Sequence, residues 1–69
     1  MPTRVITLRN VEVVRESDSS ILCRIEGHDR WIPTEQLREG TTIRRRGDVG
    51  TLVVPRAFAA EWGLTPYDG

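Results

Sequence analysis

The chain has 69 residues, which is enough for one small domain. It carries ten Arg, no Lys and ten Asp plus Glu, so its formal net charge is zero at pH 7 with the single His neutral. This balance excludes bulk electrostatic binding to DNA or to an anionic membrane, although a local basic patch remains compatible with it. The single Cys excludes an intramolecular disulfide, and no Cys/His cluster has metal-ligand spacing. We therefore expect no structural metal and no cofactor.

No apolar run approaches the roughly 18 residues of a membrane span, and the N-terminal segment lacks the apolar stretch of a signal peptide. We therefore expect no membrane association and a cytoplasmic location. Seven Val, five Ile and seven Thr favour strands, because β-branched side chains fit a pleated surface better than a helix. We expect one small β domain over residues 1–64, followed by a flexible C-terminal tail over residues 65–69.

The first β-prone run, residues 5–16, changes the parity of its apolar positions in the middle. A regular strand would place Ile6 and Leu8 on one face and the next two apolar residues on the other face. Those two residues are Val11 and Val13. The change predicts a bulge, a sharp bend or a tight turn at Arg9-Asn10, since Asn tolerates such backbone geometry.

A polar loop over residues 16–20 precedes a half-buried strand whose inward positions are Ile21, Cys23 and Ile25. Residues 27–29 predict a short turn, and residues 30–32 the partner strand. Pro33 ends that strand, because it has no N–H to donate to a neighbouring strand.

Residues 34–40 predict one helical or 3₁₀ turn, with Thr34 as its N-cap, Leu37 as its apolar plug and Gly40 as its stop. Residues 41–46 predict a strand with Ile43 inward and Arg44 outward. A hairpin loop over residues 47–50 and a last strand over residues 51–54 follow.

A short helix is predicted near the C-terminus, at about residues 55–63, with Pro55 in its first turn and Gly63 at its end. Phe58, Ala59 and Trp62 share one face of it, and Leu64 would make the accompanying hydrophobic contact. The fold expected is mainly β: a small SH3-like, partly open barrel or a strongly curved antiparallel sheet of four to five strands, closed by this helix. A sheet of three or four strands with the helix laid across it is the alternative.

The pattern speaks against catalysis. His28 falls in a predicted turn and is best explained as an exposed residue, while Cys23 falls at an inward position typical of a small core side chain. Without paired titratable groups in a concave site, we expect no catalytic residues and no enzyme activity.

Binding is better supported, because residues 44–46 are three consecutive arginines. The alternative is that these arginines are a solvated face that blocks edge pairing and is neutralised by the ten acidic residues. On a strand Arg44 and Arg46 would share one face, and Arg24, Arg30 or Arg38 could complete a guanidinium patch for phosphates or carboxylates. Trp31 could add a stacking platform, although a core or half-core position is favoured for it. Trp62 is predicted to lie in the core with Phe58. The candidate partner-binding residues are Glu16, Asp18, Arg24, Arg30, Trp31, Arg44, Arg45 and Arg46.

Two segments carry a resemblance: VEVVRESDSSILCRIEGHDRWIPTEQL over residues 11–37 and GDVGTLVVP over residues 47–55, followed by the short helix. Together they resemble small uncharacterised proteins of bacteriophages and prophages, which show a strand, a hairpin around a Gly, and then Trp-Ile-Pro. The resemblance spans roughly residues 11–64, and its Trp-Ile-Pro element is the most specific part. It implies a small binding protein in the cytoplasm of a host cell, and it transfers no functional residue.

We therefore expect a non-enzymatic protein-binding module of phage type, such as an inhibitor of a host defence protein (an anti-CRISPR, for example) or of a replication protein. The alternative is a small β-barrel that binds nucleic acid or a nucleotide through an Arg/Trp surface. An assembly role as a homodimer is a third hypothesis.

Overall fold

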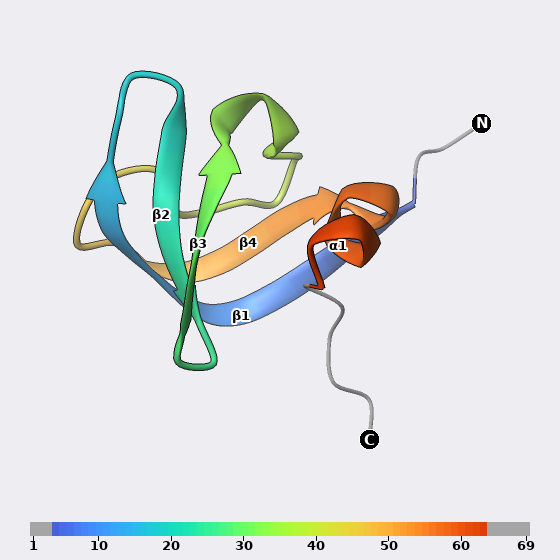
Figure 1. Ribbon diagram of the computed structural model, residues 1–69, viewed down its shortest axis with the longest axis horizontal. Helices are drawn as coiled ribbons and strands as arrows, with labels where there is room; N and C mark the ends of the chain where they lie inside the picture. The colour runs from blue at the N-terminus through green and yellow to red at the C-terminus, as the bar shows by residue number, and fades with distance from the viewer. Residues whose placement is uncertain (1–3, 64–69) are drawn as a thin grey trace.

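A computed structural model describes residues 4–63 as one open antiparallel sheet with a short helix at its end (Figure 1). The four strands lie in the order β3-β2-β1-β4, and the elements are β1 (Val5–Glu16), β2 (Ser20–Ile25), β3 (His28–Pro33), the 3₁₀ helix η1 (Thr34–Gln36), β4 (Val49–Pro55) and α1 (Arg56–Trp62). The expected curved sheet with one C-terminal helix is confirmed. No helix among the described residues has the length and apolar character needed to span a membrane.

The bend predicted at Arg9-Asn10 is confirmed. Asn10 has φ +59°, and the pairing of β1 with β4 shifts between Leu8 and Val11. β1 pairs with β4 from Val5 to Glu12 and with β2 from Glu12 to Glu16, so this strand joins both parts of the sheet. Because of the bend, the apolar positions on both sides of it reach one core.

The hairpin between β2 and β3 is tighter than the sequence predicted. Its turn consists of Glu26 and Gly27, both with positive φ (+51° and +82°), and Ile25 pairs directly with His28. Two left-handed residues form the type I′ turn whose twist matches that of the flanking strands. The prediction of a turn over residues 27–29 is therefore wrong, and β3 begins at His28.

Residues 41–46 do not form the predicted strand. Thr41 and Thr42 instead bind β4 largely through their hydroxyl groups, with one main-chain bond from Thr42 N to Thr51 O. The Thr41 Oγ1 donates to Val53 O at 3.1 Å and accepts from Val53 N at 3.0 Å, and the Thr42 Oγ1 accepts from Thr51 N at 2.9 Å. This segment covers the outer edge of β4 without adding a fifth strand.

The predicted turn over residues 34–40 is only the three-residue η1, and its cap is Pro33 rather than Thr34. The Thr34 hydroxyl lies 3.2 Å from Ser19 O and ties η1 to the turn between β1 and β2. Gly40 has φ +102° but lies beyond the end of η1, so it does not stop that helix. Leu37 is half-buried against the core, as expected.

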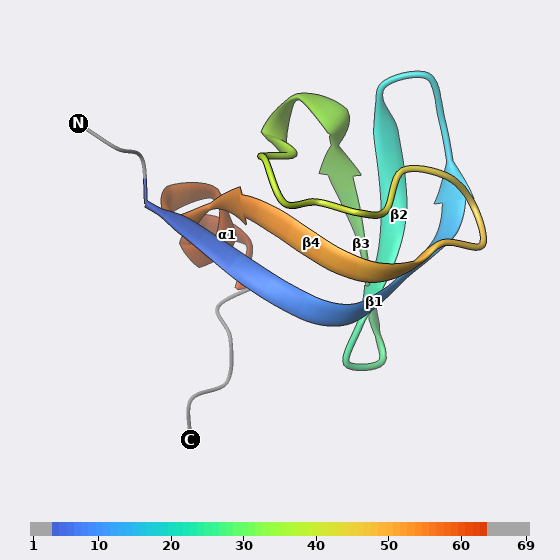
Figure 2. The ribbon, with the colours of Figure 1, turned by 180° about the vertical axis from the view of Figure 1, so that it is seen from behind.

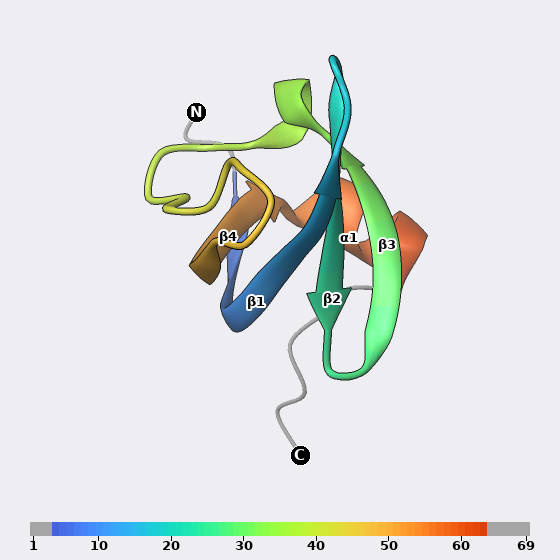
Figure 3. The same ribbon diagram turned by 90° about the vertical axis from the view of Figure 1, so that its left-hand side faces the viewer.

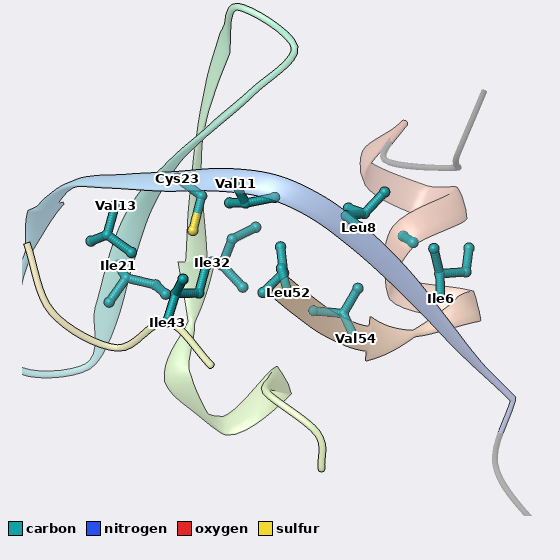
Figure 4. Close-up of a cluster of buried hydrophobic side chains, with 11 residues drawn as sticks. Ile6, Leu8, Val11, Val13, Ile21, Cys23, Ile32, Ile43, Leu52 and Val54 are labelled. Carbon is teal, nitrogen blue, oxygen red and sulfur yellow. The ribbon is translucent and has the colours of Figure 1, made fainter. Parts of the chain in front are cut away.

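The core lies inside the bent sheet, between the β2–β3 hairpin and the β1–β4 pair (Figure 4). The predicted inward residues Ile21 and Cys23 are buried, whereas Ile25 is only partly covered. Ile43 is fully buried although it belongs to no strand. Its prediction as an inward residue is confirmed, because the segment that carries it closes the open side of the core.

The C-terminal helix starts one residue later than predicted, because Pro55 still has the extended ψ of +141° and acts as the cap. Gly63 ends α1 in the left-handed conformation, as predicted, and its N–H donates to the carbonyls of Ala59 and Ala60. The predicted contact of Leu64 and the predicted tail over residues 65–69 lie outside the described residues.

Only Ala59 of α1 is fully buried, while Phe58 is partly buried. Trp62 stacks on Phe58 with ring centroids 5.3 Å apart, yet it stays 38% exposed. The core position predicted for Trp62 is therefore wrong. Trp62 is the last residue of α1, and the buried contact of the helix is made one turn earlier, at Ala59.

Candidate partner-binding surface

The three consecutive arginines lie in the loop that precedes β4, beside the C-terminal half of β1 (Figure 2). Two main-chain hydrogen bonds fix the loop to this strand: Val13 N donates to Asp48 O, and Gly47 N donates to Val13 O, each at 2.8 Å. Within the loop, Asp48 N donates to Arg45 O at 3.0 Å. The arginines are thus held on a fixed backbone.

The carboxylate of Asp48 completes this loop. Its Oδ2 accepts hydrogen bonds from the main-chain N–H groups of Arg44 and Arg45, both at 2.9 Å. These two bonds hold the pKa of Asp48 below its ordinary value, with a smaller contribution from the charge of Arg45. The nearest carboxylate of the loop therefore serves the main chain instead of pairing with a guanidinium group.

Most exposed arginines among residues 4–63 have no carboxylate partner. Within residues 4–63 the one ion pair joins Arg24 Nε to Asp29 Oδ1 at 2.9 Å. Four of these unpaired arginines lie in the loop before β4 and on the adjoining part of β1, and we call them the arginine surface: Arg15, Arg44, Arg45 and Arg46. Three come from the loop and one from the adjoining strand, so the surface spans two elements that the fold joins.

A shallow hollow of about 350 Å³ lies within this surface, lined by Val14, Arg15, Glu16 and Arg46. It forms where β1 carries an irregularity, because the pairing with β2 shifts between Val13 and Arg15 and leaves Val14 as the extra residue. Glu16 is the only carboxylate that lines it. The hollow thus offers two guanidinium groups and one negative charge.

Trp31 lies at the far side of the same outer face. The strand pairing places Trp31 opposite Leu22 and Leu22 opposite Arg15, which gives one row across β3, β2 and β1. Trp31 is 43% exposed, so it does not take the core position that was one of its two predicted settings. The reason is its position on the outer face of an edge strand, which no described element covers.

The predicted patch of Arg24 and Arg30 with the loop arginines is not assembled. Arg24 is engaged by Asp29, and this hydrogen bond lowers the pKa of the Asp29 carboxyl. Arg30 pairs with Cys23 and therefore belongs to the opposite face of the sheet from Arg24. Arg38 is half-buried and donates to Glu35 O at 2.7 Å.

The shared face predicted for Arg44 and Arg46 depended on a strand that does not form, so strand alternation does not describe them. Of the two predicted acidic residues, Glu16 lines the hollow and Asp18 lies exposed in the turn between β1 and β2. Arg15 was missed. A signal for it exists, since a regular strand would turn residue 15 inward with Val11 and Val13, and an Arg at such a position marks an irregular strand.

Neither residue considered for catalysis has a reactive setting. His28 is exposed on β3. Cys23 is fully buried, and desolvation raises the pKa of its thiol to about 11, so the nucleophilic thiolate is disfavoured. Within residues 4–63, no three His, Cys, Asp or Glu side chains are grouped so as to hold a metal ion.

No protein-family model, curated protein or solved structure matches the chain. The resemblance to small phage proteins therefore stays a prediction, and functional arguments rest on the surface itself.

Proposed function

We propose that this protein is a non-enzymatic protein-binding module that captures an acidic segment of a partner protein on the arginine surface. One observation carries the proposal: Asp48 gives its carboxylate to the main chain and leaves the neighbouring guanidinium groups unpaired. A guanidinium group binds a carboxylate through two parallel hydrogen bonds, which makes Arg the residue suited to such contacts.

The fixed backbone of the loop supports this role. Association costs conformational entropy, and a surface that is ordered before binding reduces the cost. The hydrogen bonds from Val13, Gly47 and Asp48 order the main chain that carries the arginines. Only side-chain rotamers remain to be fixed when a partner binds.

The charges around the surface favour a protein over a nucleic acid. Glu16 lines the hollow and Asp18 lies in the adjoining turn, and both would repel a continuous phosphate backbone. The net charge of zero adds no long-range attraction for a polyanion. A single carboxylate needs only one or two guanidinium groups, which the hollow supplies.

The resemblance to phage proteins, taken as an expectation, suggests the kind of partner. A protein of this type would act in the host cytoplasm on a host defence protein, as an anti-CRISPR does, or on a replication protein. A small protein can inhibit either kind of partner by occupying part of that partner's surface.

The test is affinity capture from bacterial lysate, with and without nuclease, followed by mass spectrometry. Three baits are compared: the wild type, the double variant Arg15→Ala/Arg46→Ala, and the control Arg9→Ala/Arg56→Ala, which removes two exposed arginines outside the surface. The proposal predicts a stoichiometric protein that survives nuclease, is kept by the control and is lost with the double variant.

Two outcomes would overturn the proposal. Loss of all captured material after nuclease would assign the surface to nucleic acid, and steep weakening of binding with salt would accompany it. Equal capture by all three baits would place the contact elsewhere. Glu16→Gln should strengthen capture, because it removes the one negative charge that lines the hollow.

A further inference from the structure

The two edge strands of the sheet, β3 and β4, differ in whether another segment hydrogen-bonds to their outer edge. The outer edge of β4 is covered, because Arg38 N and Thr42 N donate to the carbonyls of Val53 and Thr51, each at 2.9 Å. The outer edge of β3 (Figure 3) accepts and donates no such bonds among the described residues. His28, Asp29, Arg30 and Trp31 are all exposed. An uncovered edge is a template for another strand.

The register of the β2–β3 hairpin identifies the free main-chain groups. In a two-residue hairpin the pair next to the turn, Ile25 and His28, exchanges hydrogen bonds, and bonded and non-bonded pairs then alternate. The bond from Thr34 N to Ser19 O at 2.9 Å continues the same alternation at the far end. The N–H and C=O groups of Asp29 and Trp31 therefore point away from β2.

We infer that this edge binds the same edge of a second copy, so that two β3 strands pair antiparallel around a two-fold axis at Trp31. This register joins each Trp31 N–H to the partner's Trp31 carbonyl and each Asp29 N–H to the partner's Pro33 carbonyl. Pro33 has no N–H to donate, but its carbonyl is free for this bond. The two Trp31 side chains would then lie side by side on the outer face.

The sequence of β3 disfavours the other symmetric registers. A two-fold axis at Asp29 would place two carboxylates opposite each other, and an axis at Arg30 would do the same with two guanidinium groups. An axis at Ile32 would leave Asp29 without a bonding partner. In the register at Trp31, both Asp29 and Trp31 form main-chain hydrogen bonds with the partner, and no like charges lie opposite each other.

Self-association would also account for an exposed Trp in a very small protein. Trp31 is 43% exposed, and its partner's ring would cover it. A chain of 69 residues buries a limited apolar core, so an added interface is a usual source of stability for domains of this size. This inference does not depend on the proposed function, because the arginine surface lies on β1 and the loop rather than at the edge.

The test is sedimentation equilibrium of the purified protein from micromolar to millimolar concentration. The wild type should reach twice the monomer mass. Trp31→Glu should weaken association about thirtyfold or more, as expected for the loss of a central aromatic anchor with added charge repulsion. Val49→Glu is the matched control, because it adds the same charge at an exposed residue of β4 and should leave association unchanged.

The register has its own readout. Trp31→Glu and Trp31→Arg should each associate much more weakly than the wild type alone and should pair when mixed, because only the axis at Trp31 places residue 31 opposite itself. A thermal melt of each variant checks that it is folded. A wild type that stays monomeric throughout the range would overturn the inference, and so would a folded Trp31→Glu variant that associates as the wild type does. Wild-type association with no pairing in the mixture would overturn the register.

Discussion

Asp48 binds the main chain of Arg45 and leaves the Arg45 guanidinium group free. Asp48 Oδ2 lies 2.9 Å from the Arg45 main-chain nitrogen, which donates to it. The same oxygen lies 2.9 Å from the main-chain nitrogen of Arg44. One carboxylate thus orders the loop and leaves its positive charges available. Loop conformation and surface charge are linked through this single side chain.

The role of Asp48 predicts a specific acid response. Its carboxyl pKa is lowered in the folded protein, so its contribution to stability is present above the ordinary Asp pKa of about 3.9 and is lost as the pH falls below that value. The amide resonances of Arg44 and Arg45 should therefore titrate with a midpoint below about 3.9. A midpoint at or above the ordinary value would contradict the two hydrogen bonds.

Substitution separates the charge of Asp48 from its hydrogen bonds. Asp48→Ala should lower the melting temperature, because the N–H groups of Arg44 and Arg45 lose their acceptor. Asp48→Asn should lower it less, since an amide oxygen can still accept. Equal melting temperatures for wild type and Asp48→Ala would show that the loop does not need this anchor.

Gly50 and Thr42 should behave as a coupled pair. A Cβ on Gly50 would collide with Thr42 Oγ1, the acceptor for Thr51 N. Gly50→Ala should therefore destabilise the protein by about 1–3 kcal/mol in the wild type. The cost should be smaller in a Thr42→Ala background, and a double-mutant cycle by chemical denaturation measures the difference. Additive effects would show that the two residues do not share this contact.

Ile43 should matter as much as a core residue on a strand. It is fully buried although its segment lies outside the sheet. Ile43→Ala should cost about 2–5 kcal/mol of unfolding free energy. The control Val49→Ala, at a residue 67% exposed, should change stability by less than about 0.5 kcal/mol. Denaturant titration compares them, and a similarly small cost at both positions would mean that the segment does not close the core.

The bend in β1 depends on the left-handed backbone of Asn10, which has φ +59°. Asn10→Val should destabilise the protein by about 1–2 kcal/mol, because a β-branched residue is strained there. Asn10→Gly should stay within about 1 kcal/mol of the wild type. Arg9→Val is the matched control, because Arg9 has no positive φ. Thermal melts that rank Asn10→Val with Arg9→Val would contradict the assignment.

The alternation of apolar residues and the positions of Pro and Gly were enough to predict much of the fold. The parity change at Arg9-Asn10 predicted the bend, and the alternation of Ile21 and Cys23 predicted the inward face of β2. Pro33 and Gly63 end β3 and α1 as expected. Each of these signals acts through neighbouring residues, so its effect does not depend on contacts with distant parts of the chain.

The errors occurred where a long-range contact decided the outcome. β-propensity cannot show that the Thr41 and Thr42 hydroxyls would replace main-chain bonds along β4. The sequence predicted a strand at residues 30–32, but it could not show that this strand is an edge and that Trp31 is exposed. The choice of Asp48 between guanidinium and amide partners likewise depends on the loop's exact path.

The most direct test of the account is hydrogen exchange of the arginine Nε–H groups, measured by NMR together with the backbone amides. Arg24 provides the internal reference, because its Nε donates to Asp29 Oδ1 at 2.9 Å and should be protected. We expect fast exchange at the Nε–H groups of Arg44, Arg45 and Arg46 and slow exchange at the amides of Arg44 and Arg45. Side-chain protection equal to that of Arg24, with those two amides exchanging freely, would show that Asp48 pairs with a guanidinium and that the arginine surface is not free to bind a partner.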